Sequence, residues 1–380
     1  MNRWRMATVT SRMVWVMVVI MLALALVACG SDDEDGGGAD SGQATTVASP
    51  ASNGSTQIPA SPGGTPAETA GSPVAETASV TLALDWYPWA NHTGLYMAQA
   101  EGEFDERGLD VEIYVPSDPS TALQLVAIGE DEFTISYETD VLLAREQGLD
   151  IVSVAALVQQ PLNTIMTLES SNITDPSQLA GKTVGIAGVP SDEPLLETVL
   201  EDAGLTLDDV EVVTVGFDLM PALLGEQVDA VIGAYFVHES ILAEQQGKPV
   251  RAISIEEYGV PDYYELVLAT SGEMVREQPD VVAAFVDAIV DGYGAAEADP
   301  AQAVDELIAA YPETAEDVER EGIQRIIPYW TDDGAVPFGT QEEERWTSFA
   351  DWMFENGLLT EEVEATEAFT NEFVERAHEE

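Results

Sequence analysis

The sequence predicts an α/β protein made of two consecutive units, each with a mainly parallel β-sheet flanked by helices. Short apolar strands alternate with helical segments from Ala78 onward, and this alternation starts again near Thr183. Strands and helices that alternate at this spacing are typical of parallel sheets. From Pro279 onward the pattern is helical, and the sequence contains no internal repeat of about 20–50 residues. We therefore expect two α/β units followed by a helical tail.

The first unit is defined by apolar runs with a period of two and by helical patterns between them. Strands are expected at 78–85, 111–115, 133–136 and 151–155. Helices are expected at 96–107, 120–128 and 139–147. The first helix is expected to stop at Gly108, and the second to begin at Ser117-Asp118-Pro119, because these residues are helix stop and start signals.

The second unit repeats this order. Strands are expected at 183–187, 210–215, 230–234, 250–255 and 265–269, with helices at 193–203 and 220–226. We expect this unit to supply the second sheet.

The first 28 residues have the parts of a secretory signal peptide. Arg3, Arg5 and Arg12 precede an apolar run from Met13 to Ala28, and small residues come just before Cys29. Leu-Val-Ala-Cys-Gly resembles a bacterial lipobox, which would place a lipid such as palmitate on Cys29 and anchor the chain to the extracytoplasmic face of the cell membrane. The alternative is a membrane helix, but the run of roughly 16 residues is shorter than the ~20 needed to span a bilayer. Residues 29–77 are rich in Gly, Ser, Ala, Thr and Pro, and we expect a flexible tether there.

The charge of the chain excludes a nucleic-acid partner. The formal net charge is −57 at pH 7, with 13 Lys and Arg against 70 Asp and Glu, whereas phosphate binding needs clustered basic residues. An anionic lipid surface would also repel the chain, so membrane attachment must come from the lipid. Cys29 is the sole cysteine, which rules out an internal disulfide.

Four segments carry a resemblance to a known family. They are Leu84-Asp-Trp-Tyr-Pro-Trp-Ala-Asn-His-Thr-Gly-Leu-Tyr-Met-Ala98, Gly102–Val111, Gly181–Gly188 and Asp229–Ala234. With these segments the chain resembles the solute-binding proteins of ABC importers, in the branch that binds thiamine pyrimidines and riboflavin. The resemblance runs from about Ser79 to about Ala301.

The resemblance implies a type II-like periplasmic-binding-protein fold, whose two lobes close on a ligand about two crossover strands. The crossovers would lie near Thr164–Leu168 and Leu266–Ala269. Lobe one would contain residues 79–165 and 270–380, and lobe two residues 166–269. It further implies a small-molecule ligand, permease and ATPase subunits as partners, and no cofactor.

Aromatic and polar residues after the first strand are candidate ligand contacts, since open α/β sheets bind ligands at the carboxyl ends of their strands. Trp86, Tyr87 and Trp89 could stack on a flat ring. Asn91 offers a donor and an acceptor, although it could equally cap the next helix. His92 could contact ligand or be structural, and the spacing does not support a metal pair between His92 and His238.

Corresponding positions after later strands complete the candidate site, which is taken to hold no metal. Tyr137 could stack, and Asp140 could accept from an amine or could simply favour the start of its helix. Gly188 would allow close approach of the backbone. The remaining candidates are Tyr235, Tyr264 and Glu265, where Glu265 could bind an amine or could be a solvated acid.

No catalytic motif appears in the sequence: Gly-x-Ser-x-Gly, His-Glu-x-x-His and the dinucleotide fingerprint are all absent. The family resemblance implies that the function is capture of a flat heteroaromatic vitamin for an importer, and the missing motifs agree with a role without catalysis. Riboflavin is slightly favoured, because Trp89 stands where the pyrimidine binders of the family carry a polar residue. The alternatives are a formylated or hydroxymethylated aminopyrimidine for thiamine salvage, a sulfonate- or nitrate-type ligand, and a sensor subunit paired with a kinase. The sulfonate or nitrate alternative ranks low because the candidate loops contain no Lys or Arg.

Overall fold

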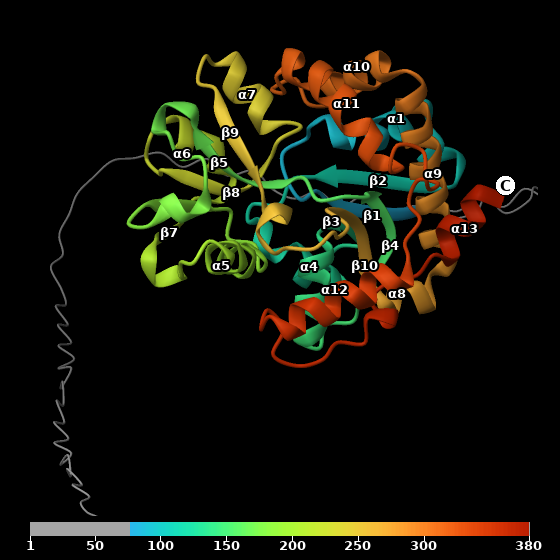
Figure 1. Ribbon diagram of the computed structural model, residues 1–380. Coiled ribbons are helices and arrows are strands. Elements are labelled where there is room, and N and C mark those ends of the chain that lie inside the picture. Colours follow the sequence, from blue (N-terminus) through green and yellow to red (C-terminus); the bar gives the residue numbers. More distant parts are fainter. Residues whose placement is uncertain (1–76, 380) are drawn as a thin grey trace, which may run out of the picture. The chain divides into compact units, whose positions relative to one another are not determined.

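The computed structural model describes residues 77–379 (Figure 1). The expected signal peptide, the lipid site at Cys29 and nearly all of the expected tether lie outside the described residues. Within 77–379, every helix is too short or too polar to cross a membrane.

The first sheet, which we call sheet A, has the strand order β2-β1-β3-β10-β4. Its strands are β1 (Ala78–Ala83), β2 (Leu109–Tyr114), β3 (Phe133–Ser136), β4 (Ile151–Val158) and β10 (Leu266–Ser271). β1 pairs in parallel with β2 and β3, whereas β10 pairs antiparallel with β3 and β4. The carboxyl ends of β1 and β3 therefore meet at one edge of the sheet.

The second sheet, which we call sheet B, has the order β7-β6-β8-β5-β9. Its strands are β5 (Asn163–Leu168), β6 (Thr183–Ile186), β7 (Glu211–Thr214), β8 (Ala230–Tyr235) and β9 (Val250–Ser254). β6 is parallel to β7 and β8, and β5 is antiparallel to β8 and β9. The α/β fold with two mainly parallel sheets is thus confirmed, with one reversed strand in each described sheet.

The chain crosses between the sheets slightly earlier than the sequence predicts. It passes from β4 to β5 through residues 159–162, and returns from β9 to β10 through residues 255–265. The segments expected as crossovers, Thr164–Leu168 and Leu266–Ala269, are instead paired strands inside the sheets. Both strands are entirely buried, so neither has the alternation of apolar and polar residues that marks a half-buried strand in a sequence.

Helices flank both sheets (Figure 1). Their bounds are α1 (Thr93–Glu101), α2 (Glu103–Glu106), α3 (Ala122–Ala127), α4 (Glu138–Glu146), α5 (Asp192–Asp202), α6 (Leu219–Leu224), α7 (Glu239–Gln245), α8 (Gly272–Glu277), α9 (Pro279–Ala298), α10 (Pro300–Ala310), α11 (Glu316–Trp330), α12 (Glu343–Glu355) and α13 (Glu372–Glu379). The single helix expected at 96–107 is divided at Gly102. This residue takes a left-handed conformation with φ of 82°, which glycine adopts without steric cost.

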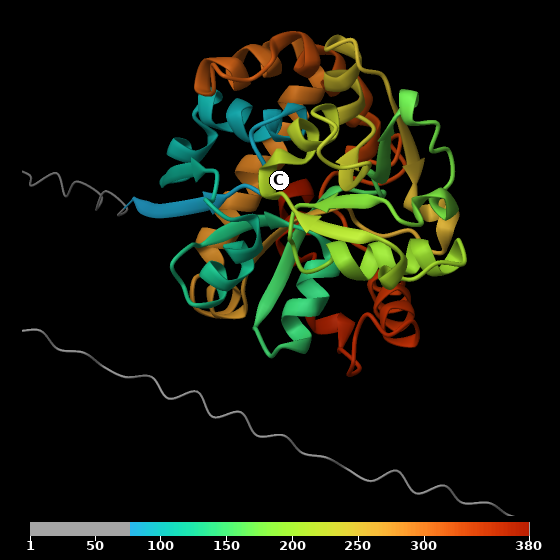
Figure 2. The same cartoon turned by 90° about the vertical axis from the view of Figure 1, so that its left-hand side faces the viewer.

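The helical tail completes the core rather than forming a separate unit. Residues of α9, α11 and α13 join the apolar cluster on one face of sheet A. Trp346 and Phe349 of α12 join a second cluster that contains residues of both sheets. α10 and α12 lie at opposite ends in Figure 1 and in Figure 2, so the tail wraps much of sheet A.

The tail also covers the β4 edge of sheet A. β4 stands last in the strand order, yet all of its residues are buried. Ser153 forms a bridge with Phe369, and Ala156 forms one with Gly339. These contacts occupy backbone groups that an edge strand would otherwise offer to another chain.

Candidate ligand-binding cavity

A cavity lies where loops from both sheets meet. The space not filled by protein atoms, counted together with the solvent at its mouth, is about 540 Å³. Its lining comes from the loops after β1, β3, β6 and β8 and from the second crossing. The lining residues are Asp85, Trp86, Trp89, Tyr137, Thr139, Asn163, Ala187, Val189, Ser191, Asp192, Leu195, Gly233, Tyr235, Glu239, Tyr263 and Glu265. The site thus occupies the carboxyl ends of parallel strands, where such folds bind ligands.

Aromatic rings form much of the wall. Trp86 and Trp89 come from sheet A, whereas Tyr235 comes from sheet B. The ring centroids of Trp89 and Tyr235 are 5.8 Å apart, with planes inclined by 52°. Trp89 is only 2% exposed, because the rings of His92, Tyr235 and His238 surround it. The two sheets therefore bring rings to a shared, largely apolar surface.

Acidic side chains supply most of the charge at the cavity. Asp85, Asp192, Glu239 and Glu265 all line it, and among residues 77–379 no Lys or Arg does so. Such a lining offers hydrogen-bond acceptors and favours a ligand with N–H donors or positive charge.

Asp85 is oriented by a buried histidine. The backbone N–H of Trp89 donates to Nδ1 of His92 at 3.3 Å, which leaves the proton of a neutral ring on Nε2. Nε2 of His92 then donates to Oδ1 of Asp85 at 2.9 Å. Both side chains are almost fully buried. The second carboxylate oxygen of Asp85 remains without a protein donor among the described residues and is available to a ligand.

Glu265 is the last residue of the second crossing, and its side chain contacts the end of the first. Its Oε2 accepts from the backbone N–H groups of Leu162 at 2.6 Å and Asn163 at 2.9 Å, and from the Tyr263 hydroxyl at 3.0 Å. Its Oε1 accepts from the Tyr235 hydroxyl at 3.1 Å. Burial outweighs these bonds and raises the pKa of Glu265 to about 7. Glu265 therefore joins protein segments and leaves little acceptor capacity for a ligand.

Two further carboxyl groups lie in the first turns of α5 and α4. Oδ2 of Asp192 accepts from the N–H groups of Gly188 at 2.6 Å and Val189 at 3.0 Å. Oδ1 of Asp140 accepts from the Ser191 N–H at 3.0 Å. Burial raises the pKa of each carboxyl group to about 7, and the charge of Asp140 adds to the rise at Asp192. Both groups thus exchange protons near neutral pH.

Of the residues predicted from the sequence, the structure brings five to the cavity wall. These are Trp86, Trp89, Tyr137, Tyr235 and Glu265. Asp140 lines a smaller neighbouring cavity that shares Asp85 and Tyr137 with the main one.

Three other predicted residues point away from the cavity. Tyr87 is 45% exposed and packs against Phe217 on the outer side. Oδ1 of Asn91 accepts from the indole N–H of Trp330 at 2.9 Å, so this side chain is buried in the core. The hydroxyl of Tyr264 accepts from the Glu342 N–H at 2.8 Å, and the Arg345 guanidinium covers its ring. The orientations of Asn91 and Tyr264 are therefore determined by packing partners more than 70 positions away in the sequence.

His92 and Gly188 each form a hydrogen bond to a carboxylate that lines the cavity. His92 holds Asp85 in place, and Gly188 donates to Asp192 in a conformation with φ of 93°. A side chain at Gly188 would bring its Cβ to 2.7 Å from Cγ2 of Thr214. Both residues shape the site without lining the main cavity.

Several lining residues are not among the candidates that the sequence predicts. Asp85 closes the first expected strand, and Asp192 directly precedes the helix expected at 193–203, so position at an element boundary is a usable signal. Asn163, Tyr263 and Glu239 had no such signal, because their place depends on where the chain crosses between the sheets.

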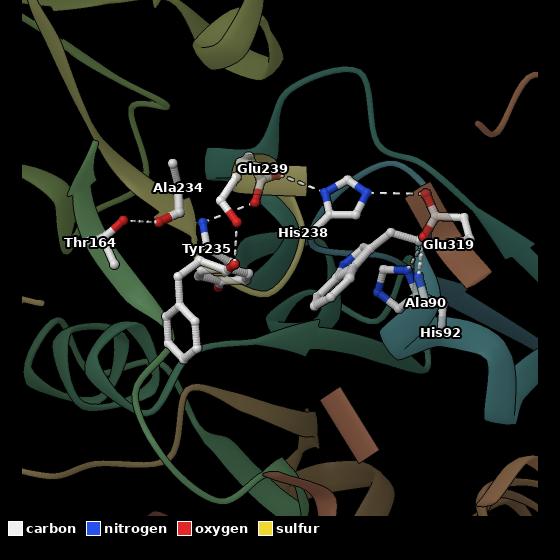
Figure 3. Close-up of polar contacts among 11 residues, drawn as sticks. Ala90, His92, Thr164, Ala234, Tyr235, His238, Glu239 and Glu319 are labelled. Carbon is white, nitrogen blue, oxygen red and sulfur yellow. Dashed lines mark hydrogen bonds and ion pairs between the residues drawn. The ribbon is translucent and has the colours of Figure 1, made fainter. Parts of the chain in front are cut away.

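His238 does not pair with His92 in the structure. Figure 3 shows it between Glu239 and Glu319, with Nδ1 at 3.0 Å from Glu239 and Nε2 at 3.1 Å from Glu319. Within residues 77–379, no group of three or more His, Cys, Asp or Glu side chains is arranged to hold a metal ion. The site is built from rings and carboxylates.

The family model described as "NMT1/THI5 like" matches residues 89–303. The chain is 37% identical over 297 residues to the formylaminopyrimidine-binding protein of Halalkalibacterium halodurans, covering 77% of this chain and 90% of that protein. It is 28% identical to the riboflavin-binding protein RibY of Chloroflexus aurantiacus, covering 78% and 86%. It is also 26% identical to the 4-amino-5-hydroxymethyl-2-methylpyrimidine phosphate synthase THI11 of Saccharomyces cerevisiae, covering 67% and 78%.

A solved structure supports the fold assignment. The alkanesulfonate-binding protein SsuA of Xanthomonas axonopodis pv. citri, bound to MOPS, superimposes with a TM-score of 0.60 at 17% identity, covering 78% of this chain and 99% of that one. Likeness at this identity shows the shared fold. Because the family match spans more than half of the sequence, the chain belongs to the NMT1/THI5-like family and has a periplasmic-binding-protein fold.

Proposed function

We propose that this protein is the solute-binding component of an ABC importer and that it captures a formylated aminopyrimidine in the cavity between its sheets. The observation that carries the proposal is the combination of aromatic walls with carboxylate acceptors at the carboxyl ends of the strands. The relative named as a formylaminopyrimidine-binding protein supports the same ligand class.

The chemistry of the cavity suits an aminopyrimidine. Such a ring presents a flat face for stacking, worth about 0.5–1.5 kcal/mol beyond burial of its area. Its amino group presents N–H donors, which match the free oxygen of Asp85 and the carboxylate of Asp192. Because His92 already orients Asp85, the Asp85 side chain loses little conformational entropy when a ligand binds.

Riboflavin remains the second candidate, favoured by the relative named RibY and by the indole of Trp89 on the cavity wall. The geometry weakens the reasoning that favoured it from the sequence. Tyr87 lies outside the cavity, and Trp89 is wedged among other rings, so the three aromatic side chains do not form one wide platform. The lining carboxylates also fit the imide and carbonyl edge of a flavin less well than they fit an amine.

An anionic ligand such as a sulfonate is disfavoured. Within the described chain the cavity wall carries Asp and Glu and lacks Lys and Arg, so a bound anion would face like charges. The pairing with a permease, rather than with a sensor kinase, is likewise part of the proposal.

The remaining elements of the proposal concern attachment and motion. A lipid on Cys29 would hold the protein to the extracytoplasmic face of the membrane, and residues 29–77 would let the α/β body reorient. The two sheets would be the cores of two lobes that close about the crossings at 159–162 and 255–265. Binding, closure and release to the permease require no bond to be made or broken, so we assign no enzymatic activity and no cofactor.

The test is calorimetric titration of the mature protein with formylaminopyrimidine and, separately, with riboflavin. We expect one-to-one binding of the pyrimidine and an affinity loss of about tenfold or more for Asp85→Asn, because one charge-assisted bond is removed. Asp110→Asn, on the exposed face of β2, is the matched control and should bind like the wild type. Turnover of either compound, or binding of riboflavin alone, would refute the proposal.

A further inference from the structure

A charged bridge connects the two sides of the cavity beside Trp89. His238 follows β8 of sheet B, and its neighbour Glu239 begins α7. Glu319 lies on α11, which packs with the core of sheet A. The imidazole of His238 stands between the two carboxylates, at 3.0 and 3.1 Å (Figure 3). Since both neighbours only accept hydrogen bonds when ionised, both ring nitrogens must carry protons, and the ring is a cation.

Each carboxylate of the bridge also holds a cavity wall through its second oxygen. Oε2 of Glu239 accepts from the backbone N–H of Tyr235 at 2.9 Å. Oε2 of Glu319 accepts from the backbone N–H of Ala90 at 2.7 Å. Tyr235 is the ring contributed by sheet B, and Ala90 directly follows Trp89, the ring contributed by sheet A. The bridge therefore runs from one wall ring to the other, and of its three side chains Glu239 alone lines the cavity.

The side chains of the bridge are mostly buried, so an uncompensated charge in it would be costly. The side chains of His238 and Glu319 are 13% and 3% exposed. Burial alone would lower the pKa of His238, but the charges of Glu239 and Glu319 outweigh burial and raise it to about 10. Removing the cation would leave two buried carboxylates facing each other, an arrangement that is strongly unfavourable.

We propose that His238 is a positioning residue whose cation holds the two aromatic walls of the cavity, Trp89 and Tyr235, in the contact that the structure shows. As far as it concerns the ligand, this inference rests on the proposed function. The part that concerns the walls stands on its own contacts and can be tested in the protein without any ligand.

The first test is backbone hydrogen exchange in the ligand-free full chain, because the bridge holds two specific N–H groups. In His238→Gln, exchange at Ala90 and Tyr235 should rise by about tenfold or more, since an uncompensated buried charge is worth more than one factor of ten in an equilibrium. Glu319→Gln, which keeps the shape and an acceptor oxygen, should give a smaller rise centred on Ala90. Unchanged exchange at both groups in His238→Gln would overturn the inference.

A matched control separates the bridge from general loosening of the same contact. Nη1 of Arg325, on α11, donates to Ser240 Oγ at 3.2 Å and to the carbonyl oxygen of Phe236 at 3.4 Å, but touches no cavity wall. Arg325→Gln should leave exchange at Ala90 and Tyr235 within about twofold of wild type. An equal rise in this variant would contradict a specific role for His238.

The second test is titration of the same variants with formylaminopyrimidine. His238→Gln should weaken binding by about tenfold or more through faster dissociation, with thermal unfolding recorded alongside to show that the variant is folded. Wild-type protein that binds no pyrimidine would defeat the proposed function but leave the exchange test in force. Wild-type binding with unaltered dissociation in His238→Gln would defeat the present inference alone.

Discussion

The carboxylate of Glu265 accepts a hydrogen bond from the backbone N–H of Asn163 at 2.9 Å, which joins the two segments where the chain crosses between its sheets. Glu265 belongs to the second crossing, whereas Asn163 opens β5 directly after the first. The side chain of Asn163 in turn accepts from the Gly233 N–H at 2.9 Å. One buried acid thus connects both crossings to the end of β8.

Glu265→Gln should therefore destabilise the protein. The amide of Gln has one acceptor oxygen, so its NH₂ group would face donors that now bind the carboxylate, at a cost of about 1–3 kcal/mol. Denaturant unfolding measures this loss. Glu257→Gln, on the exposed surface of the same crossing, is the control and should change the free energy of unfolding by less than about 0.5 kcal/mol. Equal stability of the two variants would show that Glu265 does not join the crossings.

Phe217 should contribute to ligand retention without lining the cavity. It follows β7 of sheet B, and its ring lies 4.7 Å from that of Trp86 and 4.9 Å from that of Tyr87. Trp86 lines both the cavity and the outer groove that contains Phe217. We expect Phe217→Ala to accelerate pyrimidine dissociation by roughly threefold to tenfold, the equivalent of one lost aromatic pair.

Stopped-flow measurement of dissociation checks this expectation. Val213→Ala on β7 serves as the control, since Val213 is a partly exposed apolar residue away from Trp86. Dissociation that is the same in Phe217→Ala as in the control would mean that Trp86 needs no support from sheet B.

Two glycines of α9 should respond in opposite ways to the same substitution. A Cβ at Gly292 would lie 2.2 Å from the carbonyl oxygen of Gly94 in α1, whereas a Cβ at Gly294 would meet no atom within 4 Å. Gly292→Ala should cost about 3 kcal/mol, because two packed helices must separate. Gly294→Ala should stabilise the helix by about 0.5–1 kcal/mol. Thermal unfolding of both variants measures these changes. A Gly292→Ala variant as stable as the wild type would show that α1 and α9 do not pack this closely.

The stability of the protein should fall as pH rises through neutrality. Burial raises the pKa of Asp140, Asp192 and Glu265 to about 7, above the value of about 4 for such groups in an unfolded chain. A raised pKa means that the folded state binds more protons, so the associated stability is complete below about pH 4 and is lost as pH rises through about 7.

Urea unfolding between pH 5 and pH 8 tests this sign. The urea concentration at half-unfolding should be lower at pH 8 than at pH 5. In Asp192→Asn this concentration should depend less on pH, because one of the titrating groups is gone. A midpoint that increases over this range would show that these carboxyl groups are not buried as the structure has them.

The sequence is sufficient to predict the fold class and part of the cavity. The alternation of strands and helices is local, and so is the rule that ligand contacts follow strand ends, which located Trp86, Trp89, Tyr137 and Tyr235. The crossings were misplaced by a few residues because β5 and β10 are buried on both faces and lack the alternation of a half-buried strand.

Side-chain direction was the part that could not be predicted. Asn91 turns inward because the indole of Trp330, 239 positions later, donates to it. Tyr264 turns away because Glu342 and Arg345 hold it. Glu265 was one of the candidates and lines the cavity, but its four donors come from segments whose proximity only the folded chain creates. Long-range packing partners leave no mark in the neighbouring sequence.

The most direct test is a structure of the protein crystallised with formylaminopyrimidine. The ring should lie in the cavity lined by Trp86, Trp89 and Tyr235, with its amino group directed at the free oxygen of Asp85. Electron density for the pyrimidine at any other place, or a cavity that stays empty at saturating ligand, would contradict the account.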